Sequence, residues 1–260
     1  VFNDSLPAFG AAYLRRVYQI LVHAIANRVP LVVAIAGPVT ISDQHRAWLI
    51  PLIETGWVAY LTVTDAICYH DGHDSLKPSA KRSIYSVDLF GDDAEYRKKR
   101  IIRVTDTGFS ENVLFDQDKM ISAILQRPEF QKKMTTTERN YLFGKYYAAQ
   151  ESAFTVAPGL LSACMRNEMP VFVGAAADGS GFLNSVKLWA LKQLGDKRLV
   201  EYAFDYDLHA DVFESCAYHY WGLFQSEAKA LAILILGGGV PKNYSLQPEP
   251  TLSQIFLLPD

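Results

Sequence analysis

The sequence predicts an α/β protein with a Rossmann-like, mostly parallel sheet and helices on both faces. Short, continuous apolar runs rich in β-branched residues occur at Pro30–Gly37, Val58–Thr64, Val171–Ala175 and Leu231–Leu236. Such runs are typical of strands that are buried on both sides. Segments with apolar residues at helical spacing lie between these runs, as in the right-handed strand–helix–strand units of parallel sheets. Together these two observations predict the fold class.

The remaining elements follow from spacing and from end signals. Expected helices lie at Leu14–Ala26, Arg46–Glu54, about Gln117–Leu125, Thr137–Met165 with a break near Pro158-Gly159, Phe182–Leu194 and Val212–Ala230. Ser42-Asp43 is expected to cap the second of these helices. The polar stretch from His73 to Asp106 looks like an excursion from the sheet, with a strand at Ile101–Val104, and another strand is expected at Tyr202–Tyr206. Because no linker-like tract interrupts the chain, we expect one domain over residues 1–260.

Composition and charge exclude several classes of protein. Half of the 260 residues are hydrophobic and the net charge is −3, without a Lys/Arg block of the kind that binds nucleic acid. The longest apolar runs are far shorter than the roughly 20 residues that span a bilayer, so we expect no membrane segment. Three widely spaced cysteines, Cys68, Cys164 and Cys216, favour unpaired thiols and hence a cytoplasmic protein.

Small and polar residues follow each predicted strand, where ligands collect in parallel sheets. These residues are Gly37, Thr64-Asp65-Ala66, Asp178 and Gly237-Gly238-Gly239. Glycine lets a ligand approach the backbone closely, and an acid at a strand end can accept hydrogen bonds from a ribose. The set suggests a dinucleotide cradle. However, the last glycine block lacks the third glycine of GxGxxG, so a tight turn after a core strand remains an alternative.

A second group of residues could carry chemistry beside the second strand. His70, Asp71 and His73 follow that strand, and His209 and Asp211 precede a predicted helix. Imidazole and carboxylate groups could bind a divalent metal, or could instead hold and deprotonate amines. A structural alternative is that Asp71 and Asp211 are helix caps.

Read together, these motifs resemble the deoxyhypusine synthase family, closest to its bacterial deoxyhypusine synthase-like and homospermidine synthase-like branch. The glycine block from Ile233 to Gln247 is similar to that of the family almost throughout. Thr64-Asp65-Ala66 followed by Tyr69-His70-Asp71 is similar to the Thr-Gly-Ala-Asn-Leu-Tyr-His-Asp stretch of the bacterial branch. Pro170–Ser180 resembles the strand and aspartate that contact the NAD ribose. The resemblance extends from about Leu31 to the C-terminus.

The resemblance implies a homotetramer with shared active sites and tightly held NAD. The enzyme would oxidise spermidine or a related polyamine to an imine, pass its aminobutyl group through a lysine to an acceptor amine, and reduce the product. No metal is implied. The residues that would contact NAD are Gly37, Thr64, Asp65, Ala66, Asp178, Gly237, Gly238 and Gly239. The implied catalytic residues are His70 and Asp71, and the implied amine-binding residues are Tyr69, His70, Asn184 and Asn243.

Two departures from the eukaryotic members bear on the acceptor. Those members have an acid at the position of His70 and a histidine at the position of Asn243, which favours the bacterial branch and a free diamine as acceptor over a protein lysine. In the family, the imine-bearing lysine lies in a Trp-Gly-Lys motif well beyond the glycine block. No such motif occurs up to Asp260, and we expect that segment to lie beyond it. The alternative function is a metal-dependent hydrolase that uses His70, Asp71, His73, His209 and Asp211.

Overall fold

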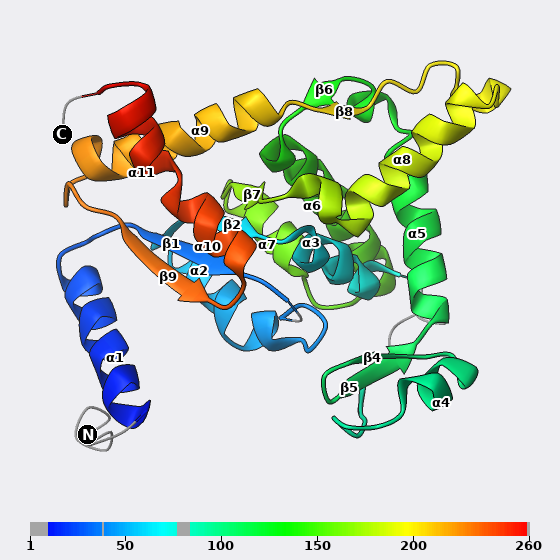
Figure 1. Cartoon of the computed structure of the whole chain (residues 1–260), viewed down its shortest axis with the longest axis horizontal. Coiled ribbons are helices and arrows are strands. Elements are labelled where there is room, and N and C mark those ends of the chain that lie inside the picture. The colour runs from blue at the N-terminus through cyan, green and yellow to red at the C-terminus, as the bar shows by residue number, and fades with distance from the viewer. Residues whose placement is uncertain (1–9, 38, 77–83, 259–260) are drawn as a thin grey trace.

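The computed structural model describes residues 10–37, 39–76 and 84–258. Its centre is a four-stranded parallel sheet (Figure 1). The strands are β1 (Leu31–Ile35), β2 (Val58–Val63), β7 (Val171–Val173) and β9 (Ala232–Leu236), in the order β7-β2-β1-β9. All three neighbouring pairs are parallel. The four apolar runs therefore form the predicted strands, and the predicted α/β class is confirmed.

The strand order creates a point at which the chain reverses direction across the sheet. From β1 the chain moves outward through β2 to β7, and it then returns to place β9 on the other side of β1. The crossovers on either side of the β1–β9 boundary thus lead in opposite directions. In open parallel sheets, the crevice beyond the carboxyl ends of such strands is where ligands bind.

Helices cover both faces of the sheet, as its buried side chains show. Val32, Tyr60 and Phe172 point to one face, where they pack against Tyr218 of α9 (Leu208–Tyr220) and Tyr244 of α10 (Gly239–Leu246). The alternate strand residues belong to the large core on the opposite face, which includes residues of α2 (Ile50–Glu54), α6 (Thr136–Phe154) and α7 (Leu160–Arg166). Because side chains alternate along a strand, each strand contributes to both layers.

The remaining elements connect and flank these layers. They are α1 (Gly10–Ala26), η1 (His45–Leu49), α3 (Asp65–Asp71), η2 (Gly72–Ser75), α5 (Asn112–Ile124), η3 (Pro128–Phe130), β6 (Lys133–Met134), η4 (Ala176–Asp178), α8 (Ser180–Gln193), η5 (Lys197–Leu199), β8 (Asp205–Tyr206), η6 (Trp221–Gln225), α11 (Pro248–Pro250) and η7 (Thr251–Ile255). The break expected near Pro158-Gly159 separates α6 from α7. The expected cap at Ser42-Asp43 is wrong: Gln44 precedes η1 without a side-chain cap, and Asp43 has a φ of 59°.

The described part of the polar excursion from residue 84 onward forms a small antiparallel sheet at one side of the molecule, together with residues up to Ser110 (Figure 1). It contains β3 (Tyr85–Ser86), β4 (Ile101–Val104) and β5 (Thr107–Ser110), covered by α4 (Asp93–Lys98). The predicted strand at Ile101–Val104 is confirmed, whereas the antiparallel pairing was not predicted.

Two expectations about the chain as a whole can be compared with the described residues. None of the helices found there is both long and apolar enough to span a membrane. All three cysteines are buried and form no disulfide.

Candidate functional site

The glycine block forms a turn at the reversal point of the sheet. Gly237 and Gly238 have φ values of 77° and 78°, which side chains other than glycine rarely adopt, and α10 begins at Gly239. A Cβ on Gly238 would lie 2.3 Å from the Cβ of Ala36, so the ends of β9 and β1 meet closely here. Above Gly237 and Gly239 a Cβ would meet nothing within 4 Å. The turn therefore leaves the backbone at the start of α10 accessible to a ligand.

Gly37 lies on the other side of the same boundary, directly after β1. Its φ is 75°, and a Cβ there would also meet nothing within 4 Å. The predicted glycines Gly37, Gly237, Gly238 and Gly239 thus gather at the carboxyl ends of β1 and β9.

A cavity of about 560 Å³ adjoins the start of α10. Gly239 and Asn243 line it from α10, and Gly174 and Ala175 line it from the end of β7. The other lining residues are Val212, Ser215, Val240, Tyr244, Gln247, Pro248 and Thr251. Asn243, which we predicted to bind the amine, therefore lies beside the glycine turn.

Thr64 lies between β2 and α3, and Asp178 is exposed after β7. The Thr64 hydroxyl is buried and makes no hydrogen bond to any described residue. A buried hydroxyl without a partner at a strand end is available to a ligand. Ala66, which is half-buried, follows in the first turn of α3.

Asp65, which we expected to contact NAD, has a structural role. Its carboxylate lies 2.6 Å from Nη1 of Arg139 in a buried ion pair. It also accepts a hydrogen bond of 2.6 Å from the backbone N–H of Gly181, in the first turn of α8. Asp65 therefore joins α3, α6 and α8 inside the protein.

Asp71, which we expected to be catalytic, is likewise occupied within the protein. Its two carboxylate oxygens accept hydrogen bonds of 2.6 and 2.8 Å from the N–H groups of Leu160 and Leu161, at the start of α7. The side chain is fully buried. Burial raises its pKa to about 6, although the two backbone hydrogen bonds act in the opposite direction. Asp71 caps a helix, which is the structural alternative that its sequence position left open.

Three predicted amine-binding residues share a second cavity of about 480 Å³. Tyr69 and His70 line it from α3, and Asn184 lines it from α8. The cavity also contains Asp118 of α5, whose Oδ1 accepts hydrogen bonds from the Tyr69 hydroxyl (2.9 Å) and from the Asn184 amide (2.8 Å). The other lining residues are Ile102, Val104, Leu114, Ser180, Leu183 and Lys187. Sequence reasoning missed Asp118 and Lys187, because neither residue directly follows a predicted strand.

His70 contributes the imidazole of this cavity. Its Nδ1 lies 3.3 Å from Nε2 of His73, which is buried behind it. The ring of His70 also packs edge-on against Tyr69, with 5.1 Å between ring centroids. These contacts hold the imidazole at the wall of the cavity.

The metal cluster of the alternative function does not form. Asp211 is buried and accepts hydrogen bonds from Thr136 and from the Tyr244 hydroxyl, whereas His209 is exposed. Among the described residues, the one group with metal-binding spacing is Asp43, His45 and Asp74, which shares no residue with the expected cluster. The hypothesis of a hydrolase built on His70, Asp71, His73, His209 and Asp211 is therefore wrong.

Known proteins resemble this chain over nearly all of its length. A deoxyhypusine synthase-like protein from a Nostoc species is 31% identical over 258 residues, which cover 98% of this chain and 63% of that protein. One from Nostoc punctiforme is 32% identical over 258 residues, covering 98% of this chain and 62% of that protein. The chain thus spans less than two thirds of the length of these relatives.

The fold and the family are each supported by a further match. A crystal structure assigned to a deoxyhypusine synthase from Entamoeba histolytica has a TM-score of 0.53 and 13% identity, covering 81% of this chain and 58% of that one. At this identity the likeness concerns the fold alone. The family model described as deoxyhypusine synthase matches residues 2–254. The chain therefore belongs to the deoxyhypusine synthase family.

Proposed function

We propose that the whole protein is an NAD-dependent transferase that moves an aminobutyl group from spermidine, or a related polyamine, to an acceptor amine. The observation that carries the proposal is the glycine turn at the boundary of β1 and β9, which opens onto the start of α10. Backbone N–H groups at a helix start hold a pyrophosphate well, and this position in a parallel sheet is the usual site of a dinucleotide.

The residues of the sheet edge fit an extended dinucleotide. Gly238 and Asp178 follow the two outer strands of the sheet, β9 and β7, and Thr64 follows β2 between them. Three strand spacings separate β9 from β7, which is about 14 Å. In our proposal, the glycines hold the pyrophosphate, the exposed carboxylate of Asp178 binds a ribose, and the buried Thr64 hydroxyl gains its missing partner.

The second cavity suits a polyamine. Asp118 supplies a carboxylate for an ammonium group, because its Tyr69 and Asn184 partners engage only one of its two oxygens in hydrogen bonds. His70 lies in the same wall and could accept a proton from an ammonium group before oxidation. Bound NAD would accept a hydride from the amine and later return it. The family's Trp-Gly-Lys motif is absent from residues 1–260, so the lysine-dependent transfer is assigned to the whole protein. We favour a free diamine as acceptor.

NAD binding tests the cofactor site directly. A carboxylate in place of Gly239 would fit the fold, because that position faces open space, but would repel a pyrophosphate. Gly239→Asp should therefore weaken NAD binding at least tenfold in calorimetric titration, whereas the neutral control Gly239→Ser should bind almost as well as wild type. Wild-type protein that does not bind NAD, or Gly239→Asp that binds it equally well, would refute the cofactor site.

Product analysis tests the reaction. The whole protein, incubated with NAD and spermidine, should release 1,3-diaminopropane, and added putrescine should be converted to a product that carries the aminobutyl group. Chromatography of the amines measures both. An NAD-binding protein that releases no diamine from spermidine or from other polyamines would show that the transferase assignment is wrong while the cofactor site is right.

A further inference from the structure

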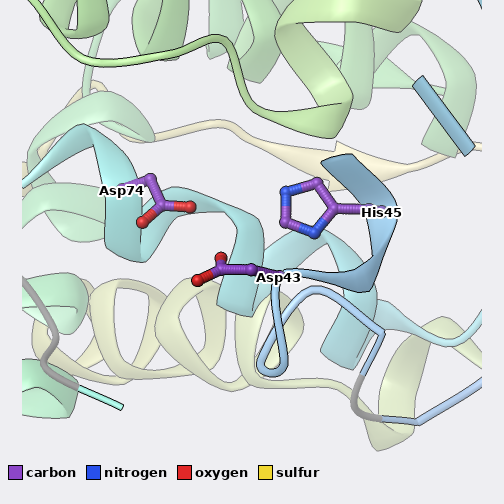
Figure 2. A group of neighbouring side chains, drawn as sticks. All are labelled: Asp43, His45 and Asp74. Atoms are coloured by element: carbon purple, nitrogen blue, oxygen red, sulfur yellow. The ribbon is translucent and has the colours of Figure 1, made fainter. Parts of the chain in front are cut away.

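We propose that Asp43, His45 and Asp74 form a binding site for a divalent transition-metal ion of the zinc type. One nitrogen of His45 and one carboxylate oxygen from each aspartate lie within 4.8 Å of one another. Figure 2 shows the imidazole of His45 and the carboxylate of Asp74 facing each other, with the carboxylate of Asp43 beside them; Asp43 and His45 lie on the segment after β1 and Asp74 lies on η2. The mixed imidazole and carboxylate donors suit zinc or manganese better than magnesium or calcium.

His45 supplies an observation that is independent of the acidic residues. Its side chain is fully buried, and its Nε2 makes no hydrogen bond to any residue that the structure describes. Nδ1 lies 3.3 Å from the carbonyl oxygen of Val39, which can only accept a hydrogen bond. Nδ1 therefore carries the proton, and Nε2 presents its lone pair. A histidine oriented in this way by a backbone carbonyl is the usual arrangement of a metal ligand.

Charged groups around His45 agree with this assignment. The side chain of His45 is completely buried, and Arg46 follows it directly in the chain. Nε2 faces Oδ1 of Asp71 at 3.8 Å, too far for a hydrogen bond.

The spacing requires only a small adjustment to bind an ion. In a tetrahedral zinc site two ligand atoms lie about 3.4 Å apart, since each bond measures about 2.1 Å. Ligand atoms that lie up to 4.8 Å apart therefore need to approach one another by at most about 1.4 Å. Asp43 can move because its side chain is 43% exposed, which also leaves a route for the ion from solvent.

Arg46 neutralises the aspartates in the metal-free protein. Its Nη2 lies 2.7 Å from Oδ2 of Asp74, and its Nε lies 3.9 Å from Oδ1 of Asp43. A metal ion would have to displace this guanidinium from Asp74, and the guanidinium is also held by a hydrogen bond of 2.5 Å from its Nη1 to the carbonyl oxygen of Pro158. The Arg46 side chain is 25% exposed, so solvent is open to it once displaced. The ion would then connect the segment after β1 to η2, which directly follows α3, the helix that carries Tyr69 and His70.

Equilibrium dialysis of tag-free protein against Zn²⁺, after treatment with a chelator, tests the site. Elemental analysis should find one zinc per wild-type chain, and Zn²⁺ should raise the melting temperature. His45→Gln should bind zinc at least tenfold more weakly and lose the thermal shift. The control His209→Gln, which removes an exposed histidine elsewhere, should behave as wild type.

Circular dichroism shows whether the His45 variant is folded. Should it unfold, Asp43→Asn provides a milder change at a half-exposed position and should also weaken zinc binding at least tenfold. Substoichiometric zinc in wild type would overturn the proposal, and so would stoichiometric zinc of unchanged affinity in folded His45→Gln or Asp43→Asn protein. Both outcomes are independent of NAD and of enzyme activity.

Discussion

The carboxylate of Asp65 and the guanidinium of Arg139 form an ion pair of 2.6 Å in the interior, where both side chains are almost completely inaccessible to solvent. Arg139 also donates a hydrogen bond of 2.6 Å to the Tyr206 hydroxyl. The pair therefore ties the end of β2 to α6 and to the short strand β8. Asp65 follows the end of a strand, where we expected a ligand contact, and its carboxylate instead holds elements of the protein interior together.

Removing one member of this pair should destabilise the protein strongly. Arg139→Met leaves the Asp65 charge buried with no cation, which typically costs about 3–5 kcal/mol. Urea denaturation should show this loss. The control Arg198→Ala breaks an exposed pair with Asp196 and should leave the midpoint unchanged. An equal effect of the two substitutions would contradict the framework role.

Asp71→Ala should destabilise the protein even when no substrate or cofactor is present. The substitution leaves two buried N–H groups at the start of α7 without acceptors, at a cost of roughly 3 kcal/mol. Asp71→Asn, which keeps one acceptor oxygen, should lose less. Thermal unfolding of ligand-free protein measures both, and an Asp71→Ala protein as stable as wild type would exclude the capping role.

Asp118→Asn should weaken polyamine binding while the protein stays folded. The amide can still accept the hydrogen bond from Tyr69, but it no longer attracts an ammonium group. We expect at least a tenfold loss of spermidine affinity in titration. Asp116→Asn, on the same helix but paired with Lys119 at the surface, should bind spermidine as wild type does. Equal spermidine affinities of the two variants would show that the amine does not bind at Asp118.

The exposed apolar face of α1 supports the proposal of a homo-oligomer. Tyr13, Leu14, Ile20 and Ile25 are each at least 51% exposed, and Ala24 is the helix's one fully buried residue. Large contiguous apolar surfaces mark interfaces. Light scattering coupled to size exclusion should give the mass of a tetramer, and Ile20→Asp should lower it. The control Arg16→Asp changes charge on the same helix. A monomeric wild-type protein would contradict the proposal.

The strands were predictable because strands buried on both faces are apolar throughout, as the completely buried Leu31–Ile35 shows. The small antiparallel sheet was not, because Tyr85–Ser86 contributes only two exposed residues and no pattern. The glycine turn was found because its conformation demands glycine. The extent of a single domain over residues 1–260 stays a prediction.

For the site residues, a different physical reason decides which of them could be predicted from the sequence. A carboxylate at an element end looks the same in sequence whether it awaits a ligand or caps another helix. The partners that decide this for Asp71 and Asp65 lie 89 and 116 residues further along the chain. Asp118 was missed in the same way, since only tertiary packing brings α5 beside His70. Nothing in the sequence around His45 indicates a metal ligand, apart from the nearby Asp43, because Asp74 joins the group only in the folded chain.

The pairing of β1 with β9 also has a consequence for how the protein is made. Leu31 pairs with Ala232, about 200 residues later, so the inner strand keeps an unfilled edge while most of the polypeptide is synthesised. Such an unpaired edge can form non-native strand pairs until β9 has been synthesised. A ligand that binds the glycine turn after β9 would also stabilise the pairing of this last strand with β1. Folding of newly synthesised chains should therefore depend on this ligand more than the stability of already folded chains does.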